Sequence, residues 1–308
     1  MSEADLGWWA VPIAMLGGAI RVSTPFIFVS LGECLTERSG RINLGLEGTL
    51  VFGAMSGYAV AFESGSAWVG VLAAAITGSL FGLFHGYVCR LPRVNDIAIG
   101  IALMLLGIGL AYFFGKPYIQ PVAPDLPAIP LGFWSEIPQL EAALQVNVLF
   151  LIGIALALLM AWMFKATKIG LTIRLVGDST DAARAAGINP NRVRLLSTAA
   201  GGALAGIGGA YLSLYYPGSW NEGISSGQGL MAVALVIFAR WSPVNCFWAA
   251  LLFGAAGALG PALQSVGVSE GYYLFYAAPY VLTLILLYAT SSTTRALTGA
   301  PAELSITK

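Results

Sequence analysis

Charged residues are scarce in this sequence. Asp, Glu, Lys and Arg together make up 10% of 308 residues, whereas a soluble domain carries about a quarter. Hydrophobic residues make up 57% and the mean hydropathy is +0.79. These values exclude an ordinary soluble domain and predict an integral membrane protein. The formal net charge is zero, and no nucleic-acid partner is expected.

Motifs of nucleotide-binding and hydrolytic proteins are also missing. The sequence has no G-x-x-x-x-G-K-[ST], so the chain is not expected to hold ATP phosphates itself. It lacks H-E-x-x-H, and its single histidine, His85, has no neighbouring ligand. Cys34, Cys89 and Cys246 lack the spacing of a metal site or a disulfide framework. An enzyme is therefore the least favoured class, and neither a metal nor a cofactor is expected on this chain.

Long apolar runs dominate what is present. A helix needs roughly 17–25 mostly apolar residues to cross a bilayer, and these runs lack the alternation of membrane strands. We therefore predict an all-α, polytopic membrane helical bundle that forms one domain over residues 1–308. About nine crossings are predicted, one of them short. They are Trp8–Leu31, Asn43–Phe62, Ala67–Cys89, Val94–Phe114, Val146–Phe164, Leu195–Tyr215, Gly227–Phe238, Val244–Leu263 and Tyr272–Tyr288.

Lysine and arginine are distributed unevenly among the loops that join these runs. All but two of the 15 fall on one side; the exceptions are Arg21, within the first run, and Lys116. Positively charged loops stay in the cytoplasm. The predicted location is a bacterial plasma (inner) membrane, with the N-terminus outside and the C-terminus in the cytoplasm.

An external loop and a cytoplasmic loop are long. The external loop, 115–145, contains six prolines, and we expect an ordered cap with an interfacial segment near residues 133–144. The cytoplasmic loop, 165–194, is predicted to contain a short helix with Asp178 as its N-cap and Gly187 at its end. About eight residues extend only about 12 Å, so this helix should lie along the membrane face.

The same loop is followed directly by a long apolar run. Asn189 and Pro190 are expected to supply the N-cap and first position of that helix. Small residues then recur at Gly201, Ala205 and Gly209, and this stripe is interpreted as close helix packing.

Polar, glycine-rich segments precede two of the apolar runs. S-G-R-I-N-L-G-L-E-G (Ser39–Gly48) comes before one, and G-I-S-S-G-Q-G (Gly223–Gly229) comes before the short one. The first is approached from the cytoplasm and the second from outside, which is typical of an inverted repeat with a binding site between its halves. Two ordinary reverse turns are the alternative. The candidate pathway residues here are Asn43, Glu47, Ser226 and Gln228, since polar groups at membrane depth usually face a wet cavity.

Further polar groups lie near membrane depth. Asn95 and Asp96 are also candidate pathway residues, although a helix N-cap is an equally good reading of their position. Arg21 needs an internal partner, for which Glu47 and Asp96 are the candidates. A structural ion pair is favoured there over a ligand contact.

Several stretches together resemble one family. Ser39–Ala54, with N-L-G-L-E-G, resembles a signature of ABC-importer permeases of the branched-chain amino acid/ribose superfamily, above all its nucleoside and simple-sugar branch. Gly177–Arg194 resembles the cytoplasmic coupling segment of that family. Ser197–Ala210, Gly229–Pro243 and Thr24-Pro25 match further blocks in family order. Two positions depart from the nucleoside-type pattern, because no asparagine lies near Met104 and Asp96 introduces a charge.

The resemblance implies a type II-like importer fold and several partners. It implies an ATPase subunit that uses ATP and Mg²⁺ on the cytoplasmic side, an external solute-binding protein, and a second related permease. A heterodimer is expected, with a homodimer as the alternative. The residues expected to couple to the ATPase are Asp178, Asp181, Ala182, Ala183, Arg184, Ala186 and Gly187.

The function that follows is a permease subunit, without catalytic residues, that carries a nucleoside or simple sugar-like solute. The alternative is a proton-coupled secondary transporter with Glu47 or Asp96 as the proton carrier. Such a transporter would not need a capped cytoplasmic helix to dock an ATPase.

Overall fold

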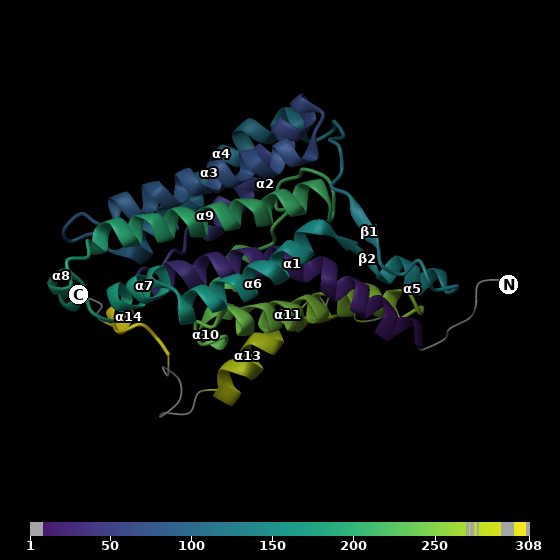
Figure 1. Ribbon diagram of the computed structural model, residues 1–308. Coiled ribbons are helices and arrows are strands. Elements are labelled where there is room, and N and C mark those ends of the chain that lie inside the picture. The colour runs from purple at the N-terminus through teal and green to yellow at the C-terminus, as the bar shows by residue number, and fades with distance from the viewer. Residues whose placement is uncertain (1–8, 269–270, 272–273, 276, 291–298, 306–308) are drawn as a thin grey trace.

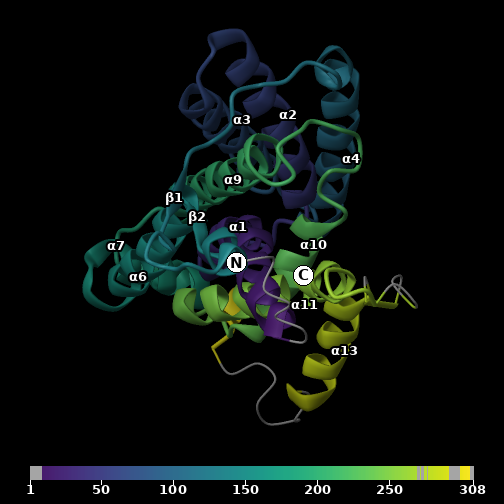
Figure 2. The ribbon, with the colours of Figure 1, turned by 90° about the vertical axis from the view of Figure 1, so that its right-hand side faces the viewer.

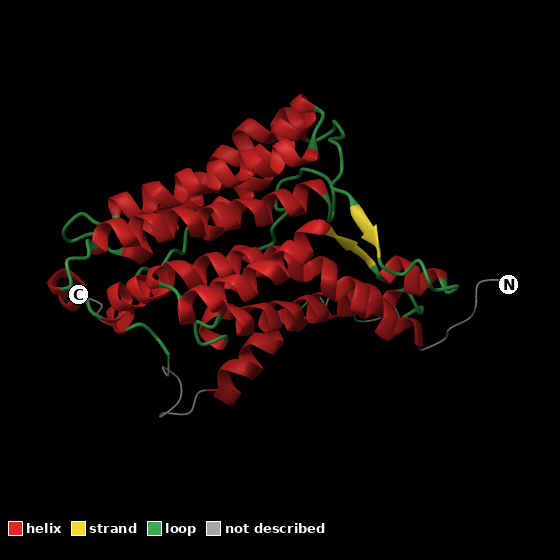
Figure 3. Ribbon diagram, viewed as in Figure 1, coloured by secondary structure: helices red, strands yellow, loops and turns green. Residues whose placement is uncertain are grey.

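The computed structural model describes residues 9–268, 271, 274–275, 277–290 and 299–305, and their regular secondary structure is almost entirely helical. The all-α prediction is confirmed (Figure 3). The helices are α1 (Ala10–Arg38), α2 (Leu46–Ser64), α3 (Ala67–Val88), α4 (Asp96–Gly115), α5 (Pro138–Ala143), α6 (Val148–Ala166), α7 (Lys168–Asp178), α8 (Thr180–Ala185), α9 (Pro190–Leu214), α10 (Gln228–Phe238), α11 (Pro243–Gln264), α13 (Ala278–Thr290) and α14 (Ala302–Ser305).

Each of the nine predicted crossings contains a helix, but they differ in length. Within the described residues, six helices are long and apolar enough to cross a membrane: α1, α3, α4, α6, α9 and α11. Helix α10 has 11 residues and is therefore only about 16 Å long. Helix α2 carries Glu47 and Glu63 near its two ends and is not among these six helices. The count of nine crossings stays a prediction.

Helix α1 runs through the middle of the molecule. Helices α2, α3, α4 and α9 lie on one side of it, and α6, α11 and α13 lie on the other (Figures 1 and 2). Residues 23–34 of α1 are buried on every side. A helix that is apolar over most of its circumference belongs in the centre of a bundle, and α1 takes that place.

Small residues bring α9 very close to its neighbours. A methyl group added at Gly202 would overlap the backbone carbonyl of Gly78 on α3, and one added at Gly209 would overlap that of Leu50 on α2. The predicted small-residue stripe is therefore confirmed as helix packing. These close contacts join α2, α3 and α9 into one layer.

The external loop forms a small ordered cap. Strands β1 (Ala128–Pro130) and β2 (Gln145–Asn147) pair antiparallel, with Ala128 opposite Asn147. Helix α5 begins at Pro138 and packs against the first half of α1, where a methyl group at Gly17 would lie 2.7 Å from the Ala143 Cα. The ordered cap is as expected (Figure 1), whereas the interfacial position of its segment stays a prediction.

We predict that Gly202→Ala lowers the melting temperature of the protein in detergent. The added methyl group meets backbone, which cannot rotate away, and overpacking of this kind costs about 1–3 kcal/mol. Gly109→Ala on α4 is the matched control, because no atom lies within 4 Å of its added methyl group. It should be neutral or slightly stabilising, since alanine favours a helix by about 1 kcal/mol. Equal melting temperatures for the two variants would contradict the packing.

Candidate functional site

The start of α10 is bound by a carboxylate from α2. Glu47 Oε1 accepts hydrogen bonds from the Ser225 hydroxyl at 2.5 Å and the Gly227 amide at 3.2 Å. Glu47 Oε2 accepts from the Gly229 amide at 2.6 Å. Glu47 is only 5% exposed. We call these four residues the α2–α10 junction.

The chemistry of the junction follows from the ends of helices. The first amides of a helix have no partners within it, and the helix dipole places partial positive charge there. A buried carboxylate needs such donors. Gly229 permits the approach, because a Cβ atom there would lie 2.6 Å from the Glu47 Cα. Gly227 has φ +82°, a left-handed conformation that suits glycine.

The other predicted pathway residues lie around the two glycine-rich segments. Asn43 is 1% exposed, and its Oδ1 accepts from the Gly45 amide at 3.0 Å. Ser226 is exposed, with its hydroxyl donating to the Gly223 carbonyl at 3.2 Å. Gln228 is half-buried, and its Oε1 is a buried acceptor without a hydrogen bond in the described structure. Asn43 therefore supports local backbone, whereas Gln228 retains a free acceptor.

The expected partner of Arg21 is wrong. Its guanidinium donates to the backbone carbonyl of Ala142 in α5, not to Glu47 or Asp96. Glu47 is satisfied by the start of α10 instead. The sequence does not reveal this contact, because α5 reaches α1 only through the fold of the external loop.

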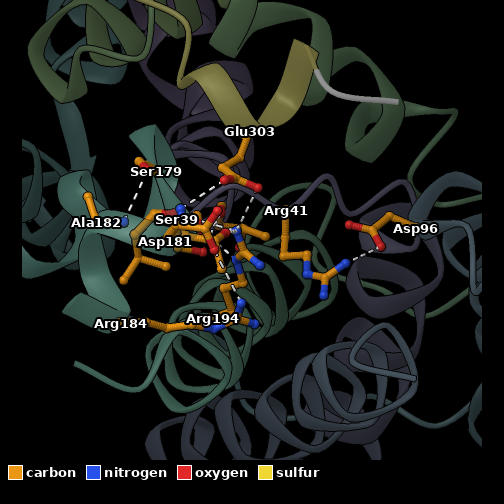
Figure 4. Close-up of polar contacts among 12 residues, drawn as sticks. Ser39, Arg41, Asp96, Ser179, Asp181, Ala182, Arg184, Arg194 and Glu303 are labelled. Carbon is orange, nitrogen blue, oxygen red and sulfur yellow. Dashed lines mark hydrogen bonds and ion pairs between the residues drawn. The ribbon is translucent and has the colours of Figure 1, made fainter. Parts of the chain in front are cut away.

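Asn95 and Asp96 belong to the start of α4. Asn95 is its N-cap, with Oδ1 accepting from the Ala98 amide at 3.0 Å, which was the alternative left open above. Asp96 forms a 2.6 Å ion pair with Arg41 (Figure 4). Arg41 precedes α2, so this pair ties the start of α4 to the start of α2.

Two buried carboxylates on α1 were missed by sequence analysis. Glu33 is fully buried, and its Oε1 accepts from the Asn43 amide at 2.7 Å. Glu37 is 3% exposed and accepts from the Trp241 indole, just after α10. Arg38 Nε adds a 2.9 Å bond to the Trp241 carbonyl. Helix α1 thus holds the segment before α2 and the segment after α10. The i, i+4 spacing of Glu33 and Glu37, directly after the first predicted apolar run, was the available signal.

Arg194 gathers four chain segments at the predicted cytoplasmic side. Its Nε donates to the Ser39 carbonyl at 3.1 Å, and its terminal nitrogen lies 2.9 Å from the Thr180 hydroxyl and 3.3 Å from Glu303 Oε2. The same nitrogen lies 3.4 Å from the Val176 carbonyl. We call Ser39, Val176, Thr180, Arg194 and Glu303 the Arg194 cluster; Figure 4 shows Arg194 beside Glu303 and Ser39.

Helix α8 differs from its prediction at one end. Its N-cap is Ser179, whose hydroxyl accepts from the Ala182 amide at 3.2 Å, so the prediction of Asp178 is wrong. Asp178 is the last residue of α7 instead. The end is confirmed, since Gly187 has φ +75° and closes the helix. Asn189 is the N-cap of α9, with Pro190 in first position, as predicted.

The residues of α8 face different ways. Asp181 and Arg184 form a 3.4 Å pair that is largely exposed, and Ala182 and Ala186 are exposed as well. Ala183 is fully buried within this chain. Ala183 is therefore the one predicted coupling residue of α8 whose side chain packs inside this chain.

Glu303 connects the C-terminal segment to α8. Its Oε1 accepts from the Thr180 amide at 2.8 Å. Burial raises the pKa of Glu303, but the hydrogen bonds from Thr180 and the charge of Arg194 outweigh burial and leave the pKa below its usual range. The carboxylate is therefore the stable form near neutral pH.

The chain belongs to the family described as branched-chain amino acid transport system, permease component, which matches residues 15–291. This confirms the resemblance given by the sequence motifs. The match extends from the first turns of α1 to the end of α13, so both the α2–α10 junction and α8 lie within it.

Relatives in three organisms cover most of the chain. A nucleoside ABC transporter permease protein of Lactococcus lactis is 31% identical over 86% of this chain and 88% of its own length. A guanosine ABC transporter permease protein of Bacillus subtilis is 30% identical over the same shares. An ABC transporter permease protein of Haloferax volcanii, provisionally named for glucose, is 31% identical over 83% of this chain and 79% of its own.

Glu47→Gln is expected to lower the melting temperature. The amide has one acceptor atom instead of two, so at least one amide at the start of α10 loses its partner. An unsatisfied buried donor costs about 1–3 kcal/mol. Ser225→Ala is the control, because it removes one donor to the carboxylate while the Gly227 and Gly229 amides keep their acceptors. The melting temperature of this variant should fall less. A Glu47→Gln protein that melts like the wild type would contradict the structural role of the junction.

Glu303→Gln tests the Arg194 cluster through pH. A lowered pKa means that Glu303 adds stability above its unfolded pKa of about 4.5 and that this stability is lost as the pH falls further. The difference in melting temperature between wild type and variant should therefore be larger at pH 7 than at pH 4, where part of this stability is lost. Asp181→Asn removes an exposed carboxylate and should show no such difference at either pH. A gap between Glu303→Gln and wild type that is independent of pH would contradict the ionic contribution.

Proposed function

We propose that this chain forms the translocation pathway of an ATP-driven importer for a nucleoside or simple sugar-like solute. The observation that carries the proposal is family membership over residues 15–291. The names of the relatives support the solute class, since two refer to nucleosides and one to glucose. The absence of a phosphate-binding loop from the sequence fits a permease whose ATP is hydrolysed, with Mg²⁺, by a partner subunit.

The proposed topology has nine crossings in a bacterial plasma membrane, with the N-terminus outside. In this scheme, six crossings are the long apolar helices, and the other three are α2, α10 and α13. The lysine and arginine distribution supports the orientation, because α8 and the Arg194 cluster then face the cytoplasm. Helices α2 and α10 begin after glycine-rich segments and meet at Glu47, which supports the inverted repeat.

The proposed pathway passes the start of α10. Gln228 has a buried acceptor without a hydrogen bond, and Ser226 is exposed beside it. Glu47 lies behind them and fixes the backbone that carries them. In this scheme Glu47 positions the pathway, and Gln228 and Ser226 offer hydrogen bonds to hydroxyl or carbonyl groups of a neutral solute.

The proposed docking element for the ATPase is α8. Ala182, Arg184 and Ala186 are exposed on it. Ser179 and Gly187 cap the helix at its two ends. The Arg194 cluster connects α8 to α1, α9 and α14. A displacement of α8 would therefore be transmitted to these helices through contacts between rigid elements. An external solute-binding protein and a second, related permease subunit complete the proposed assembly.

A proton-coupled secondary transporter has weaker support. A proton carrier must exchange its proton with water, yet Glu47 is 5% exposed and accepts from three donors. A proton on that carboxylate would face these donors and lose hydrogen bonds. Asp96 is engaged by Arg41.

Reconstitution tests the proposed function directly. The permease, its ATPase, its partner permease and the binding protein are placed in liposomes, and ATP hydrolysis is measured with guanosine, uridine, ribose or glucose added. At least one solute should stimulate hydrolysis and enter the lumen only when ATP is present. Uptake that follows a proton gradient without ATP would contradict the proposal and favour the secondary transporter.

Tryptophan substitutions on α8 separate docking from folding. Ala182→Trp and Ala186→Trp add bulk to exposed positions, so the permease should keep its melting temperature while solute-stimulated ATP hydrolysis falls at least about tenfold, since loss of about 1.4 kcal/mol of coupling has that effect. Ala183→Trp is the control, because this position is buried and the variant should destabilise the permease itself. Normal uptake with both exposed substitutions would contradict docking through α8.

A further inference from the structure

A cavity of about 370 Å³ opens between α1, α5 and α11, on the side that the proposed topology places outside. Most of its wall is made of small residues, among them Ala14, Gly18 and Ala258. Polar groups are contributed by Gln139, Tyr216 and Ser265. The charged residue in its wall is Arg21. The volume accommodates a small organic molecule or part of a larger one.

Arg21 is poorly compensated in this cavity. A guanidinium has five N–H donors, and the structure gives this one a single hydrogen bond, to the Ala142 carbonyl. In the described part of the chain no carboxylate forms an ion pair with it. Glu141, next to Ala142, is exposed and makes no such pair. Helix α1 is long and apolar enough to cross a membrane, and a charge on such a helix needs an anion, dipoles or water.

The chemistry of the missing partner follows from the donor. The guanidinium is a planar fork whose parallel N–H groups match the two oxygens of a carboxylate or phosphate. A neutral hydroxyl or carbonyl would satisfy donors and leave the charge uncompensated. The small residues leave space beside the fork, and the polar side chains of Gln139, Tyr216 and Ser265 lie in the same wall.

We propose that this cavity is a binding site for an oxyanion, a carboxylate or phosphate group, held by Arg21. The group belongs either to a water-soluble molecule that enters from outside or to the headgroup of an anionic lipid in the outer leaflet. The site does not depend on ATP or on the proposed solute, so its failure would leave the importer function standing.

The test uses the full-length chain in an uncharged detergent. Its melting temperature is followed while sodium phosphate or sodium acetate replaces sodium chloride at constant ionic strength. A second arm counts phosphatidylglycerol molecules retained from phosphatidylglycerol–phosphatidylcholine nanodiscs by native mass spectrometry. Arg21→Gln removes the charge, Ala14→Leu fills the cavity without touching Arg21, and Lys116→Gln is the control, because Lys116 is an exposed cation in the external loop.

A saturable stabilisation by phosphate or acetate that weakens at least about tenfold in Arg21→Gln and Ala14→Leu, but not in Lys116→Gln, identifies a water-soluble oxyanion. Retention of phosphatidylglycerol that falls in the same two variants, without stabilisation by the small anions, identifies the lipid. Equal behaviour of wild type and Ala14→Leu in both arms would overturn the proposal. That comparison decides the question even if Arg21→Gln does not fold.

Discussion

The arrangement depends on one interaction, the carboxylate of Glu47 at the start of α10. A glutamate inside a membrane protein and a helix that begins inside one are each costly alone, because one has a charge and the other has amides without partners. Together they satisfy each other, with three hydrogen bonds to the two carboxylate oxygens. The glycines at 227 and 229 are required for this approach, and they explain why a polar, glycine-rich segment precedes so short a helix.

Helix α1 extends this constraint to the segment before α2 and to the far end of α10. Glu33 binds the segment before α2, and Glu37 and Arg38 bind Trp241 just after α10. Helix α10 is therefore held at its start by α2 and at its end by α1. Because the Arg194 cluster joins the C-terminal end of α1 to α8, a continuous set of contacts leads from α8 through α1 to α10. In the proposed importer, this is the path by which ATP-driven motion would reach the solute.

Local signals in the sequence were sufficient for much of this structure. Asn189-Pro190 predicts the start of α9 because capping and φ restriction act within a few residues, and Gly187 predicts the end of α8 for the same reason. The N-cap of α8 was misplaced by one residue, because Asp178 and Ser179 are both good caps and α7 continues to Asp178. The partner of Arg21, the burial of Ala183 and the role of Glu33 and Glu37 depend on contacts between segments far apart in the chain, and periodicity does not contain them.

Amide hydrogen exchange at the start of α10 is the most direct measurement of the central interaction. In the purified protein, the peptide that contains Gly227 and Gly229 should exchange slowly, because both amides are bonded to a buried carboxylate. Exchange there should accelerate in Glu47→Gln, while a peptide from the middle of α9 keeps its wild-type rate. Fast exchange of this peptide in the wild type, or an unchanged rate in Glu47→Gln, would contradict the account.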